Sequence, residues 1–398
     1  MGNRRTSTIA RLAAALLLMT LVAAACDWPG YRYGPALTGS NDTERTLTPA
    51  NVATVVQRYS VPIGPSGRVG APVVAGGTVY VTTEYADPAG PIPNVGAVQA
   101  FRASTGDLLW THPLDGVPTD PTTAPGIVLV GVGSAVLALD ADTGEVAWEA
   151  PVAGYVNTTV AVDGGRVFYA ADRYDVPGSP VGALDARTGT PVWTRTFATT
   201  WATGPTIGDG RVYVGTFYPG DAILAVGEQD GATIYTEPTA GALSSQLAFR
   251  DGALYVGTSL DRMEAYDAAT GALRWATDAA GRGFTSSPTV TADTVYDCLA
   301  TIQIPTPPFD ALAAHDPATG AERWRVPMNC SSIVQANGVL YVASLDTVRV
   351  LDAGTGGALA SWTLGGNVSD PVVANGSVYV AVNNLTGASG QLVRFALP

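Results

Sequence analysis

A short turn motif recurs along this chain at a nearly constant interval. The sequence D-x-x-T-G occurs at residues 140–144, 185–189, 267–271, 316–320 and 352–356, and residues 102–106 read RASTG. An aromatic residue usually stands four positions after the glycine, and successive aromatics are 38 to 49 residues apart. A period of this length is typical of repeat folds in which each unit is one small sheet.

A second pattern lies between these turns. It consists of a short apolar strand, a turn with Gly, Asn or Asp, and a strand that alternates β-branched and aromatic residues. The clearest copies are at residues 71–81, 204–214, 287–297 and 370–380. Each hairpin is followed by a third strand, the D-x-x-T-G turn and a fourth strand with the aromatic residue. Eight such units predict an all-β fold, an eight-bladed β-propeller of four-stranded antiparallel blades.

The two ends of the chain complement each other. The eighth unit begins at Asn367, and no fourth strand follows it before residue 398. Residues 52–63 form an unassigned strand, in which Tyr59 and Pro62 repeat the aromatic-to-proline spacing of other fourth strands. We therefore predict that this N-terminal strand completes the last blade and closes the ring, which removes the open sheet edges.

The recurring turn has a structural explanation. Aspartate and threonine side chains bind the turn backbone, and glycine adopts a positive φ at little cost. The aromatic side chain can wedge against the adjacent blade. A catalytic residue is needed once, whereas this cluster recurs around the ring, so we interpret the aromatics as structural. The predicted blade-docking residues are Tyr59, Trp110, Trp148, Trp193, Tyr235, Trp275, Trp324 and Trp362.

The N-terminal segment has the features of an export signal. Three arginines precede an apolar run that is too short to span a bilayer. The run ends LVAAAC, which resembles the lipobox of bacterial lipoproteins, so Cys26 is the expected lipidation site. We predict a signal peptide at residues 1–25, a lipid-anchored lead-in at 26–51 and a single propeller domain at 52–398. Asp27 favours retention at the outer face of the cytoplasmic membrane.

Cysteine and charge content narrow the possible partners. Cys298 and Cys330 remain for an exported chain, and a disulfide between them is the expected state. All 21 basic residues are arginine, and 18 of them remain against 34 acidic residues once the signal is removed, a net charge of about −16. Such a surface repels nucleic acid and anionic lipid headgroups. We expect a monomer that contacts the membrane only through its lipid.

The repeat also carries a family resemblance. The pattern A-x-D-x-x-T-G-x-x-x-W resembles the tryptophan-docking motif of the eight-bladed quinoprotein (PQQ-type) propellers, and residues 27–52 are similar to the segment before their first blade. In blade number, length and lipidation the chain resembles the lipoprotein propeller subunit of the outer-membrane β-barrel assembly machinery. The resemblance implies a non-catalytic scaffold or binding module whose partner is an envelope protein or surface ligand.

The alternative function is that of a PQQ-dependent alcohol dehydrogenase, which the same resemblance implies together with a quinone and Ca²⁺. Enzymes of this type use two adjacent cysteines, and quinohaem members add C-x-x-C-H; the chain has neither. Asp120 and Asp370 are the candidates for a Ca²⁺ ligand or base, although solvated channel carboxylates are the favoured interpretation. We therefore expect no cofactor, no metal site and no catalytic residue.

Long loops suggest where a partner binds. The connections between second and third strands are long at residues 84–95, 172–180 and 299–310. Aromatic residues on these loops suit contact with protein or carbohydrate, although they can equally be ordinary loop fillers. The candidate binding face comprises Tyr85, Tyr174, Trp201, Phe217, Tyr218 and Phe309.

Overall fold

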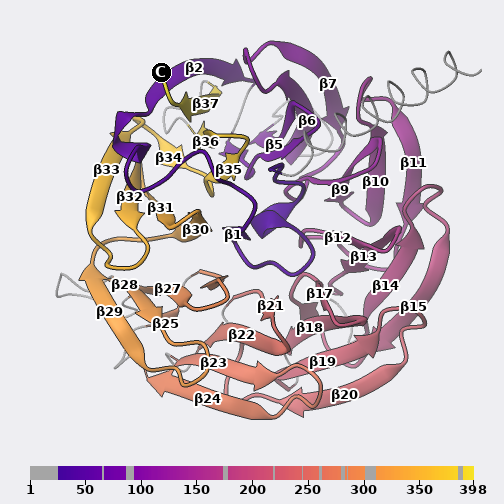
Figure 1. Ribbon diagram of the computed structural model, residues 1–398. Helices are drawn as coiled ribbons and strands as arrows, with labels where there is room; N and C mark the ends of the chain where they lie inside the picture. The colour runs from indigo at the N-terminus through magenta and orange to yellow at the C-terminus, as the bar shows by residue number, and fades with distance from the viewer. Residues whose placement is uncertain are drawn as a thin grey trace, which may run out of the picture.

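The strands of this protein form a closed ring of small sheets. The computed structural model describes residues 26–64, 67–86, 94–173, 178–217, 220–243, 245–259, 262–278, 283–284, 286–300, 311–383 and 389–398. Eight sheets are arranged radially around a central axis (Figure 1), which confirms the predicted all-β, eight-bladed propeller. The helical elements in these ranges are two 3-10 turns, η1 (Tyr31–Tyr33) and η2 (Val52–Thr54). No helix of the described residues has the length and apolar character needed to span a membrane.

The blades follow one another in chain order. Blade one contains β3 (Arg68–Val69), β4 (Val73–Ala75), β5 (Thr78–Ala86), β6 (Asn94–Arg102) and β7 (Leu108–Leu114). Blade two contains β8 (Thr122–Ala124), β9 (Ile127–Val132), β10 (Ala135–Asp140) and β11 (Val146–Pro151). Blade three contains β12 (Ala161–Asp163), β13 (Arg166–Ala170), β14 (Ser179–Asp185) and β15 (Pro191–Phe197). Blade four contains β16 (Trp201–Ala202), β17 (Thr206–Gly208), β18 (Arg211–Phe217), β19 (Ala222–Gly227) and β20 (Thr233–Pro238).

The second half of the ring repeats this plan. Blade five contains β21 (Ala248–Arg250), β22 (Ala253–Thr258), β23 (Arg262–Asp267) and β24 (Leu273–Asp278). Blade six contains β25 (Gly283–Phe284), β26 (Thr289–Val290), β27 (Val295–Ala300), β28 (Ala311–His315) and β29 (Glu322–Pro327). Blade seven contains β30 (Ser332–Ala336), β31 (Val339–Ser344), β32 (Thr347–Asp352) and β33 (Ala358–Thr363). Blade eight contains β34 (Asn367–Val368), β35 (Val372–Ala374), β36 (Ser377–Asn383), β37 (Gly390–Ala396) and β2 (Val56–Ile63).

Blade eight shows how the ring closes. Strand β2, near the start of the chain, pairs antiparallel with β37 at its end, from Val56 opposite Ala396 to Ile63 opposite Gly390. The two strands lie side by side at the edge of the ring (Figure 1). The predicted closure is therefore confirmed, since the N-terminal strand β2 supplies the outer strand of the last blade.

Apolar contact between neighbouring blades forms the core. One cluster joins Phe168 and Ala170 of blade three to Ile207, Val212 and Val214 of blade four. Phe168 and Val212 are fully buried, and burial of such side chains contributes roughly 1.5–3 kcal/mol each. Since clusters of this kind recur around the ring, the stability of each blade depends on both of its neighbours.

The D-x-x-T-G turns have the predicted hydrogen bonds. The Oδ1 of Asp140 accepts hydrogen bonds from the Thr143 amide at 2.9 Å and the Thr143 hydroxyl at 3.0 Å. These bonds lower the pKa of Asp140. Gly144 closes the turn with a φ of 73°, a conformation that L side chains rarely adopt.

The aromatic residue of each fourth strand contacts the next blade. A β-bulge precedes it in the pairing of third and fourth strands, for example between Ala138 and Leu139, and such bulges re-aim side chains. The indole or phenol then donates a hydrogen bond to a main-chain carbonyl in the turn of the next blade. The acceptor is the residue that follows the aspartate position of that turn. These bonds join Tyr59 to Ala103, Trp110 to Ala141, Trp148 to Ala186, Trp193 to Glu228, Tyr235 to Ala268 and Trp275 to Pro317.

The last two aromatics, Trp324 and Trp362, contact the next blade through their rings. The Trp324 ring lies beside Gly356 of blade seven, where an added Cβ would stand 3.0 Å from it. Trp362 stacks on Phe395 of blade eight, with ring centroids 4.3 Å apart. Blade eight has no D-x-x-T-G turn in its sequence, so an aromatic side chain provides the packing surface there.

Blade six contains two side-chain links. The predicted Cys298–Cys330 disulfide is present and joins blade six to the start of blade seven, with Cα atoms 5.6 Å apart. Beside it, the ring Nε2 of His315 lies 3.2 Å from the Asp297 carboxylate. Both residues are buried, and Asp297 occupies the position of Val130 in blade two and Val214 in blade four.

Candidate functional site

The lead-in segment runs around the inside of the ring. Its main chain bonds in turn to the inner strands of blades one, two, four, five, six and seven (Figure 1). These bonds join Trp28 to Val74, Pro29 to Thr123, Pro35 to Ile207, Ala36 to Phe249, Thr38 to Val290 and Gly39 to Gln335. The short strand β1 (Ser40–Asn41) then pairs parallel with β30, and the Asn41 amide donates to Val373. Residues 26–41 therefore make one circuit and close one end of the central channel.

The two faces of the propeller consequently differ. We call the side with the D-x-x-T-G turns and the first hairpin turns, such as Asn375–Gly376, the turn face. The opposite side, where second strands end, as at Phe217, is the loop face. The lead-in bonds to the turn-face ends of the inner strands. The channel is therefore floored by the lead-in and opens toward the loop face.

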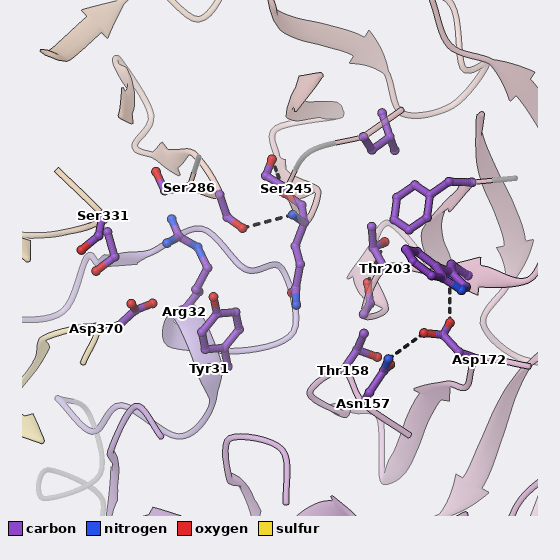
Figure 2. Close-up of a pocket in the computed structure, with 18 residues that line it drawn as sticks. Tyr31, Arg32, Asn157, Thr158, Asp172, Thr203, Ser245, Ser286, Ser331 and Asp370 are labelled. Carbon is purple, nitrogen blue, oxygen red and sulfur yellow. Dashed lines mark hydrogen bonds between the residues drawn. The ribbon is translucent and has the colours of Figure 1, made fainter. Parts of the chain in front are cut away.

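A cavity of about 410 Å³ occupies this channel, within the usual range of small-molecule sites. Figure 2 shows Arg32 of the lead-in pointing toward Ser286 and Ser331, with Asn157 and Asp172 on the opposite wall. A second cavity of about 670 Å³ adjoins it and shares Tyr31 and Asn157 in its lining. The site is thus built from the lead-in and from blades far apart in sequence.

Arg32 is the cation at the floor. It is only 2% exposed, and its backbone has a φ of 50°, so the neighbouring lead-in contacts hold it in a strained conformation. Its Nη2 donates to the Pro288 carbonyl at 2.7 Å and the Thr289 hydroxyl at 2.9 Å. Burial lowers the pKa of Arg32, while Tyr31 and Asp370 oppose that change.

The two carboxylates singled out in the sequence do line the channel. Asp370 lies in the wall of the first cavity and Asp120 in the wall of the second. Asp120 accepts a hydrogen bond from the Ala71 amide at 3.0 Å. Burial raises the pKa of Asp120 to about 6; Arg68 opposes that rise and Asp370 adds to it. Burial and Asp370 also raise the pKa of Tyr31.

The third carboxylate, that of Asp172, accepts a hydrogen bond on each of its oxygens. Asp172 accepts from the Asn157 side-chain amide at 2.7 Å and from the Ala202 main-chain amide at 2.9 Å. Burial raises the pKa of Asp172, and these two hydrogen bonds oppose that rise. In the described part of the chain, no three His, Cys, Asp or Glu side chains lie close enough together to hold a metal ion.

The candidate binding face is only partly gathered at the cavity. Trp201 and Phe217 line it, with ring centroids 6.4 Å apart in an edge-to-face arrangement, and Trp201 is 51% exposed. Tyr85 lies at the loop-face end of β5 and lines neither cavity. Tyr174, Tyr218 and Phe309 lie outside the described residues.

Sequence reasoning missed several residues of the site. Tyr31 and Arg32 lie in the lead-in, where the glycine-flanked run GYRYG was the only local signal. The cavity serines, such as Ser286 and Ser332, precede or begin inner strands, and nothing in the local sequence distinguishes them. Tyr155, at the rim of the second cavity, is 56% exposed.

Comparisons with known proteins place the fold among repeat propellers. The profile of the family described as "Outer membrane protein assembly factor BamB" matches residues 94–176, 177–300 and 309–395. No curated protein matches the chain in sequence.

Solved structures share the architecture at low sequence identity. Quinohemoprotein alcohol dehydrogenase from Comamonas testosteroni is 16% identical, with 94% of this chain and 81% of that chain covered and a TM-score of 0.76. BamB from Moraxella catarrhalis is 18% identical, with 86% and 97% covered and a TM-score of 0.64. A europium-containing methanol dehydrogenase is 14% identical, with 96% and 100% covered and a TM-score of 0.74. At such identities these likenesses show the fold alone.

Proposed function

The chain belongs to the family of outer membrane protein assembly factor BamB, and from this premise we propose that it is a non-catalytic, lipid-anchored extracytoplasmic scaffold. Its loop face binds a protein partner in the cell envelope, and the lipid holds it at the outer face of the cytoplasmic membrane. The observation that carries the proposal is that four of the eleven exposed large apolar side chains of the described residues lie on the face opposite Cys26, while the other seven lie on outer strands.

The position of Cys26 supports the first half of this proposal. Its carbonyl accepts a hydrogen bond from the Asn375 amide at 3.2 Å, and the carboxylate of Asp27 accepts from the Asn375 side chain at 2.8 Å and from the Gly76 amide at 2.9 Å. All of these contacts are at first hairpin turns, so Cys26 lies on the turn face. A lipid on its sulfur would orient the turn face toward the membrane without a flexible linker.

The loop face carries the apolar contacts that a partner needs. Val117, Tyr155, Trp201 and Leu345 are 37%, 56%, 51% and 67% exposed. They lie in connections between blades or in the turn between second and third strands. Exposed aromatic and aliphatic side chains on such connections suit contact with a protein partner. Strands such as β18 separate this face from the turn face by about 20 Å.

A variant pull-down tests the partner surface. The tagged full chain, crosslinked on membranes, should enrich a reproducible partner that is lost when Val117→Ser and Tyr155→Ser are combined. Leu273→Ser, at an equally exposed position on the outer strand β24, is the matched control and should retain it. Equal recovery by both variants would refute the assignment of the loop face.

The anchor has its own test. Cys26→Ala should move the protein from the membrane fraction to the soluble extracytoplasmic fraction, because the sulfur is the proposed lipid attachment point. Asp107→Ala, a change at an exposed turn-face residue, should leave the distribution unchanged. Membrane retention of Cys26→Ala would mean that another element anchors the chain.

The dehydrogenase alternative fits the residues poorly. No three His, Cys, Asp or Glu side chains of the described residues lie close enough together to hold a metal ion, and Cys298 is bonded to Cys330 across two blades rather than to a neighbour over the channel. The carboxylates Asp120 and Asp370 line different cavities. Absorbance and dye-linked alcohol oxidation after addition of quinone and Ca²⁺ test this alternative: a bound chromophore with turnover would replace the scaffold proposal.

A further inference from the structure

Unpaired polar atoms gather in one cavity. Among the described residues, eleven buried side-chain nitrogen or oxygen atoms lack a hydrogen-bond partner, and five of them belong to four residues that line the 410 Å³ cavity. These five atoms are Arg32 Nε, Arg32 Nη1, Gln246 Oε1, Ser286 Oγ and Ser332 Oγ. A buried polar group without a partner costs about 1–3 kcal/mol. Such a concentration around one space indicates that a polar ligand completes these bonds.

The unpaired groups include both donors and acceptors. Arg32 uses Nη2 for Pro288 and Thr289, so the N–H groups on Nε and Nη1 remain available. The serine hydroxyls can donate or accept, and Gln246 Oε1 can only accept. The wall also contains the carboxylate of Asp370.

This balance argues against an anionic ligand. An anion would gain from Arg32 but would also meet Asp370 and Asp172 in the same cavity. The chain as a whole carries a net charge of −13, which repels anions at a distance. A neutral ligand with many hydroxyl groups avoids both costs, because each hydroxyl donates and accepts.

An aromatic surface stands at the opening of the same cavity. Trp201 lines it, and half of its side chain is exposed; Phe217 supports it edge-to-face. A flat apolar ring at the mouth of a polar cavity suits a ligand with one apolar face and a hydroxylated edge. A sugar ring has both features.

From these features we propose that the cavity between Arg32 and Trp201 binds the terminal sugar of a neutral glycan. The hydroxyl groups of the terminal sugar bond to Arg32, Ser286, Ser332 and Gln246, and the C–H face of the next sugar packs on Trp201, which adjoins the opposite wall at Asp172. The site is formed before the ligand arrives, because the lead-in holds Arg32 through main-chain bonds such as Gly39 to Gln335. The polar end of this site, at Arg32, Ser286, Ser332 and Gln246, is separate from the residues assigned to the protein partner, whereas Trp201 belongs to both surfaces.

Ligand-observed NMR and calorimetry on the purified mature protein test the proposal. The probes are the methyl glycosides of glucose, galactose and mannose, together with cellobiose and trehalose, at millimolar concentration. Acetate and inorganic phosphate serve as the anionic probes. At least one neutral sugar should bind while the two anions do not. Binding of the anions alone, or of none of the probes, would overturn the proposal.

Variants locate the bound sugar. Ser286→Ala and Ser332→Ala should each weaken binding about fivefold, the effect of losing one hydrogen bond. Ser179→Ala is the matched control, since Ser179 Oγ is also buried and unpaired but lies outside the cavity. It should bind as the wild type does, and all three variants should fold because no bonded hydroxyl is removed.

The aromatic contact is tested separately. Trp201→Ala should weaken binding about tenfold, and Trp201→Phe should restore part of it, since a smaller ring still offers an apolar face. Sugar affinity that is unchanged in Trp201→Ala and in both serine variants would place the sugar elsewhere and refute the site. Loss of sugar binding in the two serine variants leaves the protein pull-down intact, because Ser286 and Ser332 are not among the loop-face residues assigned to the partner, so the two proposals fail separately.

Discussion

The indole of Trp148 donates a hydrogen bond of 3.1 Å to the main-chain carbonyl of Ala186, in the next blade. Ala186 follows the aspartate of the turn Asp185–Gly189, and the indole also lies against Gly189 of that turn. Each D-x-x-T-G turn therefore receives the aromatic residue of the preceding unit. The motif and the aromatic in one unit serve two different interfaces, which couples every blade to both neighbours.

The glycine of this turn should tolerate no side chain. Gly189 has a φ of 69°, and an added Cβ would lie 2.5 Å from the Trp148 ring. Gly189→Ala should lower the free energy of unfolding by about 3 kcal/mol, from left-handed strain and overpacking together. Gly165→Ala, at a φ of 76° with no atom within 4 Å, should cost about 1 kcal/mol. Urea denaturation measures both, and equal losses would exclude the indole contact as a cause.

The disulfide should stabilise the closed ring. Cys298 and Cys330 are 32 residues apart, and the loop-entropy relation gives about 3–4 kcal/mol for a loop of this length. Replacement of both cysteines by serine should lower the unfolding free energy by that amount under oxidising conditions. The wild type in a reducing agent is the control and should show the same loss.

The buried pair in blade six should make stability depend on pH. Asp297 raises the pKa of His315 by its hydrogen bond and charge, although burial opposes this, and burial raises the pKa of Asp297. Both groups hold protons more tightly in the folded chain, so stability falls as pH rises through their folded pKa values. Denaturation of the wild type at pH 5.5 and 8 should show this fall.

A variant without the pair provides the comparison. Asp297→Val with His315→Leu places the residues of other blades at these positions, as at Val130 and Leu139, which are fully buried. Well-packed apolar replacements of a buried ion pair are often neutral or stabilising. This double variant should show a smaller fall in stability between the two pH values. An equal fall would assign the pH dependence to other groups.

The channel carboxylate Asp120 should destabilise the protein at neutral pH. Its folded pKa is about 6, against about 3.9 in an unfolded chain. The folded state therefore binds the extra proton between these values, and stability decreases as pH rises through them. Asp120→Asn keeps an oxygen for the Ala71 amide and should raise the unfolding free energy at pH 8 by up to about 3 kcal/mol. At pH 3.5 the variant and the wild type should be equally stable.

The repeat could be predicted from the sequence because the residues that define it are close together in the chain. The turn residues, the alternating strands and the spacing of the aromatics all lie within one unit, so eight blades follow from counting them. The closure by β2 was also predictable, since Tyr59 and Pro62 carry the spacing of a fourth strand. The disulfide was predictable from two cysteines in a chain that its N-terminal segment led us to expect outside the cytoplasm.

The site could not be predicted in the same way. Arg32 reaches Thr289 across 257 residues of sequence, and Trp201 and Ser286 come from different blades. The bulges that aim each aromatic at the next blade are also absent from the sequence pattern. The sequence thus determined the number and kind of blades, because hairpins and turns form from neighbouring residues. Only the tertiary structure decided which residues line the channel. Ring closure and the path of the lead-in bring together residues that share no local sequence pattern.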